Sequence, residues 1–302
     1  MSKTYFAVSD THSFYRPLMA ALTEAGYDKS NPDHILILCG DAFDRGPDSV
    51  KMLKFLRSLP KENRILIRGN HERLLDECFQ RGFYCSHDRT NGTLRTMCDI
   101  SGVNFKRYDK LVKQLKGREI SVQEYVSAVD AFWEEATTKP FQSQKLKETI
   151  DWINSDDWVN YFRLGNLVFV HAWIPVKQDP AGLDLWGDKA PEFSYDEDWE
   201  SRSEKEWDVA SWLCPWKAFL SELGPSAGDT IVCGHWHVQD FHKYLGLEED
   251  GDKNREIYYS DRLIALDAMT AMKPHVCNVL VIKDGKCYDK HGNVLGDKKE
   301  EE

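Results

Sequence analysis

The sequence predicts an α/β fold in which parallel strands alternate with helices. Five apolar runs of strand length each stop at a polar residue: "YFAVSD" at Asp10, "ILILCGD" at Asp41, "RILIRGN" at Asn70, "LVFVH" at His171 and "TIVCGH" at His235. The runs lack polar alternation, which is typical of strands buried on both faces. Helical spacing of apolar residues follows the first two runs, as expected for βαβ units. Ligands in such folds bind beyond the carboxyl ends of the strands, where all five polar residues would emerge together.

The predicted elements follow the chain in order. Leu18, Leu22 and Ala25 predict a helix after the first strand, and Val50, Leu53 and Leu56 predict one after the second. The segment "YFRLGNLVFVHA" predicts a hairpin with Gly165-Asn166 as its turn. A late strand is expected in "LIALDA".

The distribution of the polar residues predicts a single domain, because positions 10 through 237 must meet in one core. We expect this domain to span residues 1–292, with residues 293–302 as a disordered tail. Residues of about 76–158 are expected to form a helical cap, since apolar residues keep helical spacing from Val122 to Trp133. A second insertion, about 176–228, is acidic and tryptophan-rich and is expected to be an irregular surface element with aromatic anchors.

Composition limits the classes of function. Thirty-nine Lys plus Arg against 50 Asp plus Glu give a net charge of −11, which opposes affinity for a long nucleic acid. No apolar run approaches the ~20 residues of a membrane span, and the N-terminal apolar stretch is too short for a signal peptide, so we expect a cytoplasmic protein. The eight cysteines form no C-x-x-C pair, which favours reduced thiols.

The motifs at the strand ends supply metal-ligand chemistry. "SDTH" places Asp10 and His12 two residues apart, and "GDAFDRG", "RGNHE", "VHA" and "GHWH" add a carboxylate, an amide oxygen and three imidazoles. Such oxygen and nitrogen donors suit hard-to-borderline divalent cations. A given residue type occurs at a given position by chance roughly one time in twenty at average composition. The full set of motifs in this order is therefore not a plausible coincidence.

The order D-x-H, G-D-x-x-D-R-G, G-N-H-E, V-H-A and G-H-x-H resembles the calcineurin-like metallophosphoesterase superfamily. Its "DRG" and "RGNHE" forms are most similar to bacterial and phage relatives of the phosphoprotein (Ser/Thr) phosphatase branch. The resemblance covers Ser9 to about Ile282, apart from the two insertions. It implies the metallo-dependent phosphatase fold, an αββα sandwich of two mixed sheets flanked by helices.

The resemblance also implies two divalent metal ions, Mn or alternatively Fe, Zn or Co, bridged by Asp41. The implied ligands of one ion are Asp10, His12, Asp41 and His237, and those of the other are Asp41, Asn70, His171 and His235. His237 is the least secure ligand, because the phosphatase branch usually has no histidine there. Two ions roughly 3.5–4 Å apart can clamp a phosphoryl group, and a hydroxide bridging them would be the nucleophile.

Three further residues take catalytic roles by this resemblance. His71 corresponds to the general acid that protonates the leaving oxygen, Asp44 to the carboxylate that orients it, and Arg45 to the fork that holds phosphate oxygens. Without the family context, Asp44 and Arg45 could be a local ion pair that caps a helix. Glu72 is expected to buttress the loop, and Asn91 and Thr93 are candidates for lining the pocket.

The sequence departs from the family pattern at three places. Ser13 and Trp173 stand where the phosphatases usually have glycine. A second phosphate-binding arginine is missing from "ASWLCPWKAF", which leaves Arg202, Arg89 or Arg95 as substitutes.

Three functions are compatible with these residues. The first is a phosphomonoesterase of the Ser/Thr protein phosphatase type, acting on a phosphorylated protein or a small phosphate ester. The second is a hydrolase of diphosphate bonds like the symmetrical diadenosine tetraphosphatases, in which tryptophans could stack adenine. The third is a non-catalytic metal-binding scaffold, against which the joint presence of His71, Asp44 and Arg45 argues. The physiological substrate and the oligomeric state do not follow from the sequence.

Overall fold

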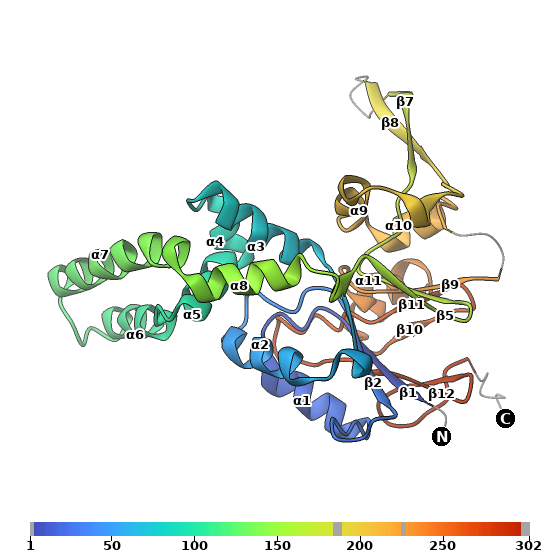
Figure 1. Cartoon of the computed structure of the whole chain (residues 1–302), viewed down its shortest axis with the longest axis horizontal. Helices are drawn as coiled ribbons and strands as arrows, with labels where there is room; N and C mark the ends of the chain where they lie inside the picture. The colour runs from blue at the N-terminus through green and yellow to red at the C-terminus, as the bar shows by residue number, and fades with distance from the viewer. Residues whose placement is uncertain (1–2, 184–188, 225–227, 297–302) are drawn as a thin grey trace.

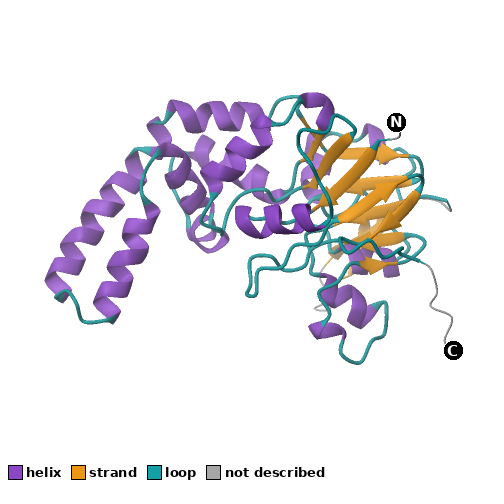
Figure 2. Ribbon diagram, turned by 90° about the horizontal axis from the view of Figure 1, so that it is seen from below, coloured by secondary structure: helices purple, strands orange, loops and turns teal. Residues whose placement is uncertain are grey.

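Two mixed β-sheets pack against each other through a shared apolar layer, with helices on their outer sides (Figure 1). The computed structural model describes residues 3–183, 189–224 and 228–296. Figure 2 shows the strands gathered on one side of the molecule and a pair of long helices projecting from the other. This arrangement is the αββα sandwich that the family resemblance implied.

The first sheet contains the three N-terminal strands. Its order is β13 (Lys286–Tyr288), β12 (Leu280–Lys283), β1 (Thr4–Val8), β2 (His34–Cys39), β3 (Arg64–Ile67) and β4 (Trp158–Val159). Strands β1 to β4 are parallel, whereas β12 pairs antiparallel with both β1 and β13. Helix α1 (Tyr15–Glu24) connects β1 to β2, and α2 (Ser49–Ser58) with the short η1 (Lys61–Asn63) connects β2 to β3. The predicted βαβ alternation is therefore confirmed.

The second sheet carries the later strands. Its order is β10 (Tyr258–Tyr259), β11 (Leu263–Ala265), β9 (Thr230–Cys233), β6 (Leu167–Val170) and β5 (Tyr161–Leu164). Strands β6, β9 and β11 are parallel. The predicted hairpin is present, with Leu164 opposite Leu167 across a two-residue turn, and β11 is the expected late strand.

Alternate residues of each central strand point to different apolar layers. Between the sheets lie Ala7, Ile37, Ile67, Phe169, Val232 and Ile264. Phe6, Val8, Leu36 and Leu38 instead pack under α1 and α2, against residues such as Leu18, Leu22 and Leu53. Because both faces of the strands are buried, the runs carry no polar alternation.

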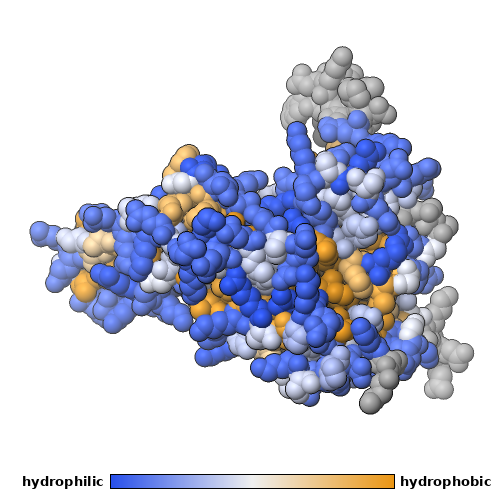
Figure 3. All heavy atoms as spheres, in the orientation of Figure 1, coloured by the Kyte–Doolittle hydropathy of each residue, from blue (hydrophilic) through white to orange (hydrophobic). Residues whose placement is uncertain are grey.

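The first insertion is helical, as expected. It contains α3 (Asn70–Arg81), α4 (Ser86–Asn91), α5 (Thr93–Ser101), α6 (Phe105–Lys116), α7 (Val122–Thr138), η2 (Pro140–Gln142) and α8 (Gln144–Ile153). Helices α6 and α7 form an antiparallel pair, here called the helical arm, that projects away from the sheets (Figure 1). The apolar stripe predicted for α7 is buried only toward its C-terminal end, because Phe132 and Ala136 pack on α5 while Val122 and Val126 are exposed. Figure 3 shows mostly hydrophilic residues on this face, with hydrophobic ones gathered in a few patches.

The second insertion has more regular structure than expected. It forms an antiparallel pair, β7 (Lys177–Leu183) and β8 (Lys189–Ser194), followed by η3 (Trp199–Ser201), α9 (Glu204–Ala210) and α10 (Pro215–Leu220). Trp199 and Trp207 are the anticipated aromatic anchors, since both are buried against the outer face of the second sheet. Beyond β9 follow α11 (Val238–Tyr244) and η4 (Gly251–Lys253).

The start of the expected disordered tail is ordered. Val294 forms a bridge with Tyr288, Leu295 N donates to the Cys287 carbonyl, and Leu295 packs against the layer between the sheets. The expectation of disorder is therefore wrong for residues 293–296, whereas residues 297–302 lie outside the described part of the chain. The eight cysteines are free thiols. Within the described residues, none of the helices has the length and apolar character of a membrane-spanning segment.

The helical arm has a small core of its own, which yields a stability prediction. Phe132 is 1% exposed and meets the rings of Tyr108 and Phe105 at centroid distances of 5.1 and 5.4 Å. Phe132→Ala should weaken this packing by about 3–5 kcal/mol and increase proteolysis within residues 105–138. Val126→Ala is the matched control, because Val126 is 49% exposed on the same helix. Equal protease resistance of the two variants would contradict this account of the arm.

Candidate metal centre

Side chains from the carboxyl ends of both sheets converge on one buried centre. Asp10, Asp41 and Asn70 follow β1, β2 and β3 of the first sheet, and His171 and His235 follow β6 and β9 of the second. The side chains form two clusters, and within each cluster the possible ligand atoms all lie within 4.8 Å of one another. One cluster contains His12, Asp41 and His71, and the other contains Asp41, His171 and His235. Asp41 belongs to both groups, so the structure contains a candidate dinuclear site.

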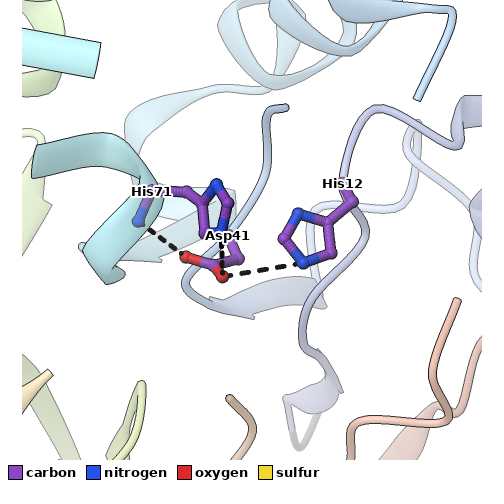
Figure 4. Close-up of side chains that lie close together, drawn as sticks. All are labelled: His12, Asp41 and His71. Carbon is purple, nitrogen blue, oxygen red and sulfur yellow. Dashed lines mark hydrogen bonds and ion pairs between the residues drawn. The ribbon is translucent and has the colours of Figure 1, made fainter. Parts of the chain in front are cut away.

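The Asp41 carboxylate faces imidazoles on both sides. Its Oδ1 lies 3.4 Å from His171 Nε2, and its Oδ2 lies 3.7 Å from His12 Nε2 and 3.8 Å from His71 Nε2. Figure 4 shows His12, on a loop, and His71, at the start of α3, directed at this carboxylate. Burial alone would raise the pKa of Asp41, but the surrounding imidazoles hold that pKa well below its usual range. Asp41 is therefore ionised and available as a bridging ligand.

Backbone carbonyls orient the imidazoles of His12 and His171. His12 Nδ1 lies 3.0 Å from the Phe43 carbonyl, and His171 Nδ1 lies 3.0 Å from the Cys39 carbonyl. When such a ring carries a single proton, donation from Nδ1 leaves the lone pair on Nε2, the atom directed at Asp41. His171 Nε2 also lies 2.8 Å from Asn70 Oδ1, which is likewise an acceptor when the amide nitrogen points away. Two acceptors at this distance need a proton or a cation between them, so the donor set fits a metal ion.

Asp10 joins the two sheets. Its Oδ2 accepts from Ser9 Oγ and, at 2.8 Å, from the backbone N–H of His235, while its Oδ1 lies 4.0 Å from His12 Nε2. Burial is the main reason that the pKa of Asp10 is raised to about 6. A cation beside Oδ1 would offset the cost of keeping this carboxylate charged.

His71 and Asp44 form a buried pair next to Asp41. His71 Nδ1 lies 2.8 Å from Asp44 Oδ2, which also accepts a 2.8 Å hydrogen bond from Thr93 Oγ1. The backbone N–H of Asp44 donates to Thr96 Oγ1. Burial favours the neutral imidazole, but Asp41 and Asp44 outweigh it and raise the pKa of His71 to about 9. Both threonines lie on α5; Thr93 was anticipated as a lining residue, whereas Thr96 was not. Asn91, also anticipated, is half-buried at the end of α4.

Arg45 spans the mouth of the first cluster. Its Nη1 lies 2.8 Å from His12 Nε2 and its Nη2 lies 3.1 Å from His71 Nε2. Although its neighbours are buried, Arg45 itself is exposed, so its planar fork is accessible to a ligand. The alternative of a helix-capping ion pair is not what the structure shows, since Asp44 pairs with His71 and α2 begins only at Ser49.

Glu72 braces the loops that carry Asp41 and Asn70. Its Oε2 accepts from the N–H groups of Gly69 and Asp41, and its Oε1 accepts from that of Ala42, each at 2.9 Å. This network matches the expected buttressing role. Burial, with Asp41 nearby, raises the pKa of Glu72 to about 7.

The site loops adopt unusual backbone conformations. Six residues of the centre have positive φ: Asp10 (50°), His12 (44°), Asp41 (55°), Asp44 (71°), Arg45 (57°) and His235 (66°). Each such residue costs on the order of 1–3 kcal/mol, and such outliers cluster at functional sites. The chain also passes very close to the ligands, since a Cβ on Gly234 would lie 2.1 Å from Asp10 Oδ2 and one on Gly69 would lie 2.2 Å from Asp41 Oδ1. The glycines of "GH" and "RGN" are thus required sterically.

The two residues that replace family glycines are accommodated in different ways. Ser13 has a φ of 59°, and its buried hydroxyl donates to Ser49 Oγ at 3.1 Å. Trp173 is buried in the outer core of the second sheet, where its Nε1 donates to the Leu223 carbonyl at 2.9 Å. Both larger side chains are therefore buried with their polar atoms hydrogen-bonded.

His237 is the predicted ligand that the structure places apart. Its side chain is 36% exposed and its Nε2 lies 3.9 Å from Asp267 Oδ2. Neither His237 nor Asp10 belongs to the two clusters, but Asp10 is buried and its Oδ1 lies 4.0 Å from His12 Nε2. Asp267 was not anticipated, although it follows β11 as Asp10 and Asp41 follow their strands. It is buried, and burial together with Asp10 raises its pKa well above the usual range.

The three substitutes for a second phosphate-binding arginine are all engaged elsewhere. Arg202 pairs with Asp196, Arg95 lies 2.9 Å from Asp109, and Arg89 stacks over the Trp133 ring at 4.9 Å. The structure therefore supports none of them in that role.

Comparison with known proteins identifies the family. The model of the calcineurin-like phosphoesterases matches residues 4–239, and the chain belongs to that family. Together with the His/Asp clusters, this membership defines a metal-dependent hydrolase that acts on phosphoric ester bonds.

Similar proteins include enzymes of two kinds. The symmetrical bis(5'-nucleosyl)-tetraphosphatase of Photorhabdus laumondii is 39% identical over 67 residues, which are 22% of this chain and 23% of that protein. That of Legionella pneumophila is 35% identical over 86 residues, 28% and 30% of the two chains. These matches span less than a third of either relative. The solved cold-active protein-tyrosine phosphatase of a psychrophilic Shewanella species aligns over 97% of this chain and 80% of its own, with 14% identity and a TM-score of 0.48.

The bracing by Glu72 can be tested directly. Glu72→Gln leaves one acceptor oxygen for three N–H groups, and its amide nitrogen would face a donor. We expect a loss of about 2–3 kcal/mol in unfolding free energy, measured by urea denaturation, together with weaker metal binding.

Glu77→Gln is the matched control, because Glu77 is exposed on the same helix. Its effect should stay within about 0.5 kcal/mol. Equal stability of the two variants would show that the Glu72 network contributes nothing.

Proposed function

We propose that the protein is a dinuclear phosphomonoesterase of the Ser/Thr protein phosphatase type, acting on a phosphorylated protein or a small phosphate ester. The observation that supports this most strongly is the juxtaposition of the buried His71–Asp44 pair and the Arg45 fork with the Asp41 clusters. A scaffold that only bound metal would need neither the pair nor the fork. The proposal also includes a cytoplasmic location and a single domain with two insertions, which extends past the expected end at residue 292 because Leu295 packs against the layer between the sheets.

The proposed ligands divide between two divalent ions, with Mn favoured and Fe, Zn or Co as alternatives. Asp10, His12 and Asp41 would hold one ion, and Asp41, Asn70, His171 and His235 the other. His237 would complete the first set only if its ring turned away from Asp267. When bound, such ions supply positive charge for the phosphoryl oxygens and lower the pKa of water enough for attack near neutral pH.

His71 is proposed as the general acid. Asp44 holds Nδ1 at 2.8 Å, which leaves Nε2 facing the centre. In the present arrangement Arg45 Nη2 lies 3.1 Å from that nitrogen, so Arg45 and a proton on Nε2 compete for the same place. A phosphate that draws the guanidinium onto its oxygens would free Nε2 to carry the proton for the leaving oxygen.

A second candidate is the hydrolysis of diphosphate bonds in dinucleotides. It is favoured by the names of the tetraphosphatases that match part of the chain and by an exposed tryptophan near His235. Both candidates use the same metal-centred chemistry and differ in the leaving group. Long nucleic acids are not expected as substrates, because the net charge is −11.

Metal content tests the bridging role. Asp41→Asn removes a charge shared by both sites and should lower the content of both ions, whereas His12→Ala should weaken mainly one. The measurement is elemental analysis after dialysis against Mn²⁺, with the exposed Asp151→Asn as control. Full hydrolytic activity of wild-type protein in excess chelator would contradict the proposal.

Leaving-group dependence tests the general acid. His71→Asn should keep its metal content but lower kcat roughly 10²–10⁴-fold for alkyl phosphates, which need a proton in the transition state. The loss should shrink for p-nitrophenyl phosphate, whose leaving group departs without one. Asp44→Asn should show the same pattern in weaker form.

The exposed His291→Asn is the control for histidine loss. Metal loss in proportion to activity in the His71 variant would instead make His71 a ligand, as its position in the first cluster also allows. Unchanged turnover with metal bound would overturn the hydrolytic mechanism.

A further inference from the structure

An exposed tryptophan lies beside the metal centre, where the two insertions meet. Trp212, in the loop between α9 and α10, is 43% exposed, and its ring centroid lies 6.1 Å from that of the candidate ligand His235. On another side lies His87 of α4, at a centroid distance of 6.2 Å and an interplanar angle of 35°. His87 is also exposed. Two exposed aromatic rings from insertions far apart in sequence thus lie next to each other, and one of them contacts His235.

The fold does not explain the position of Trp212. Trp158, Trp173, Trp199 and Trp207 are each at most 4% exposed and fill the apolar layers. Among the tryptophans that the structure describes, Trp212 is the one exposed by more than a third. Exposing so much apolar surface costs free energy that a ligand could recover by covering it.

The side chain of Trp212 is also not what orients His235. The His235 ring interacts with the backbone of Trp212 through a hydrogen bond, which any residue at position 212 could provide. The orientation of His235 therefore does not require the indole. Its contact with His235 is edge-on, at an interplanar angle of 86°, rather than stacked.

We propose that Trp212 is a stacking platform for a planar aromatic group carried next to the phosphoryl group of the substrate. This inference rests on the proposed function, because it assumes that the phosphoryl group binds beside His235. A ring one ester bond or one sugar away from the phosphorus then lies over the indole. The ligand chemistry is thus an aryl phosphate or a nucleotide, and stacking on tryptophan tolerates either kind of ring.

The test compares substrates with and without an aromatic group in Mn²⁺-loaded protein. Trp212→Ala should raise KM roughly 5- to 150-fold for the aromatic substrates p-nitrophenyl phosphate, a phosphotyrosine peptide, AMP and diadenosine tetraphosphate. The increase should be much smaller for a phosphoserine peptide, and kcat should change little. Trp212→Phe should recover most of the affinity. Larger effects on AMP and diadenosine tetraphosphate would identify a nucleotide subsite, and larger effects on the other two an aryl subsite.

Two further measurements separate the subsite from the chemistry. Val209→Ala is the control, since Val209 is 50% exposed on the neighbouring helix α9. Calorimetric binding of AMP and of phenyl phosphate to both tryptophan variants detects the subsite even without turnover. If wild-type protein hydrolysed none of the substrates but bound either ligand through Trp212, the proposed function would fail and the subsite would stand. Equal losses for aromatic and alkyl substrates, or no change in KM or binding, would overturn the subsite.

Discussion

The attraction between one buried carboxylate and the imidazoles around it organises this protein. Asp41 follows β2 in the middle of the first sheet and faces His12 and His71 on one side and His171, which follows β6 of the second sheet, on the other. Each of these residues follows a different element, so the site exists only when both sheets are assembled. Packing the two sheets together thus brings the ends of strands that are distant in sequence close enough to Asp41 for their side chains to share metal ions.

This arrangement is costly without bound cations. Asp10, Asp41, Asp44, Glu72 and Asp267 are all buried around the same centre, and burial raises the pKa of Asp10 to about 6 and of Glu72 to about 7. Six residues in left-handed backbone conformations add strain to the same loops. Divalent cations would offset the repulsion between the carboxylates, and ions that bind only the folded chain would stabilise it by mass action. The acidic, strained loops are therefore consistent with a centre built to hold metal.

The sequence predicted what local patterns can encode. Strand length, buried strands and the residue after each strand follow from short stretches, so the alternation of strands and helices and the convergence of Asp10, Asp41, Asn70, His171 and His235 were anticipated. The sandwich of two sheets was expected only from the family resemblance. Contacts made between distant elements were not. Nothing near Thr96 indicates that its hydroxyl supports the Asp44 backbone, and nothing near Trp212 indicates that it meets His87. The ligand role of His237 stays a prediction, because its ring faces Asp267 rather than the clusters. The prediction of disorder was wrong for residues 293–296, because Leu295 packs against an apolar layer that composition does not reveal.

The most direct test of the central role of Asp41 is an anomalous-difference map from a crystal of the Mn²⁺-loaded protein. We expect two peaks roughly 3.5–4 Å apart, with the Asp41 carboxylate bound to both and His71 bound to neither. A single peak, or a pair of peaks without Asp41 between them, would contradict it.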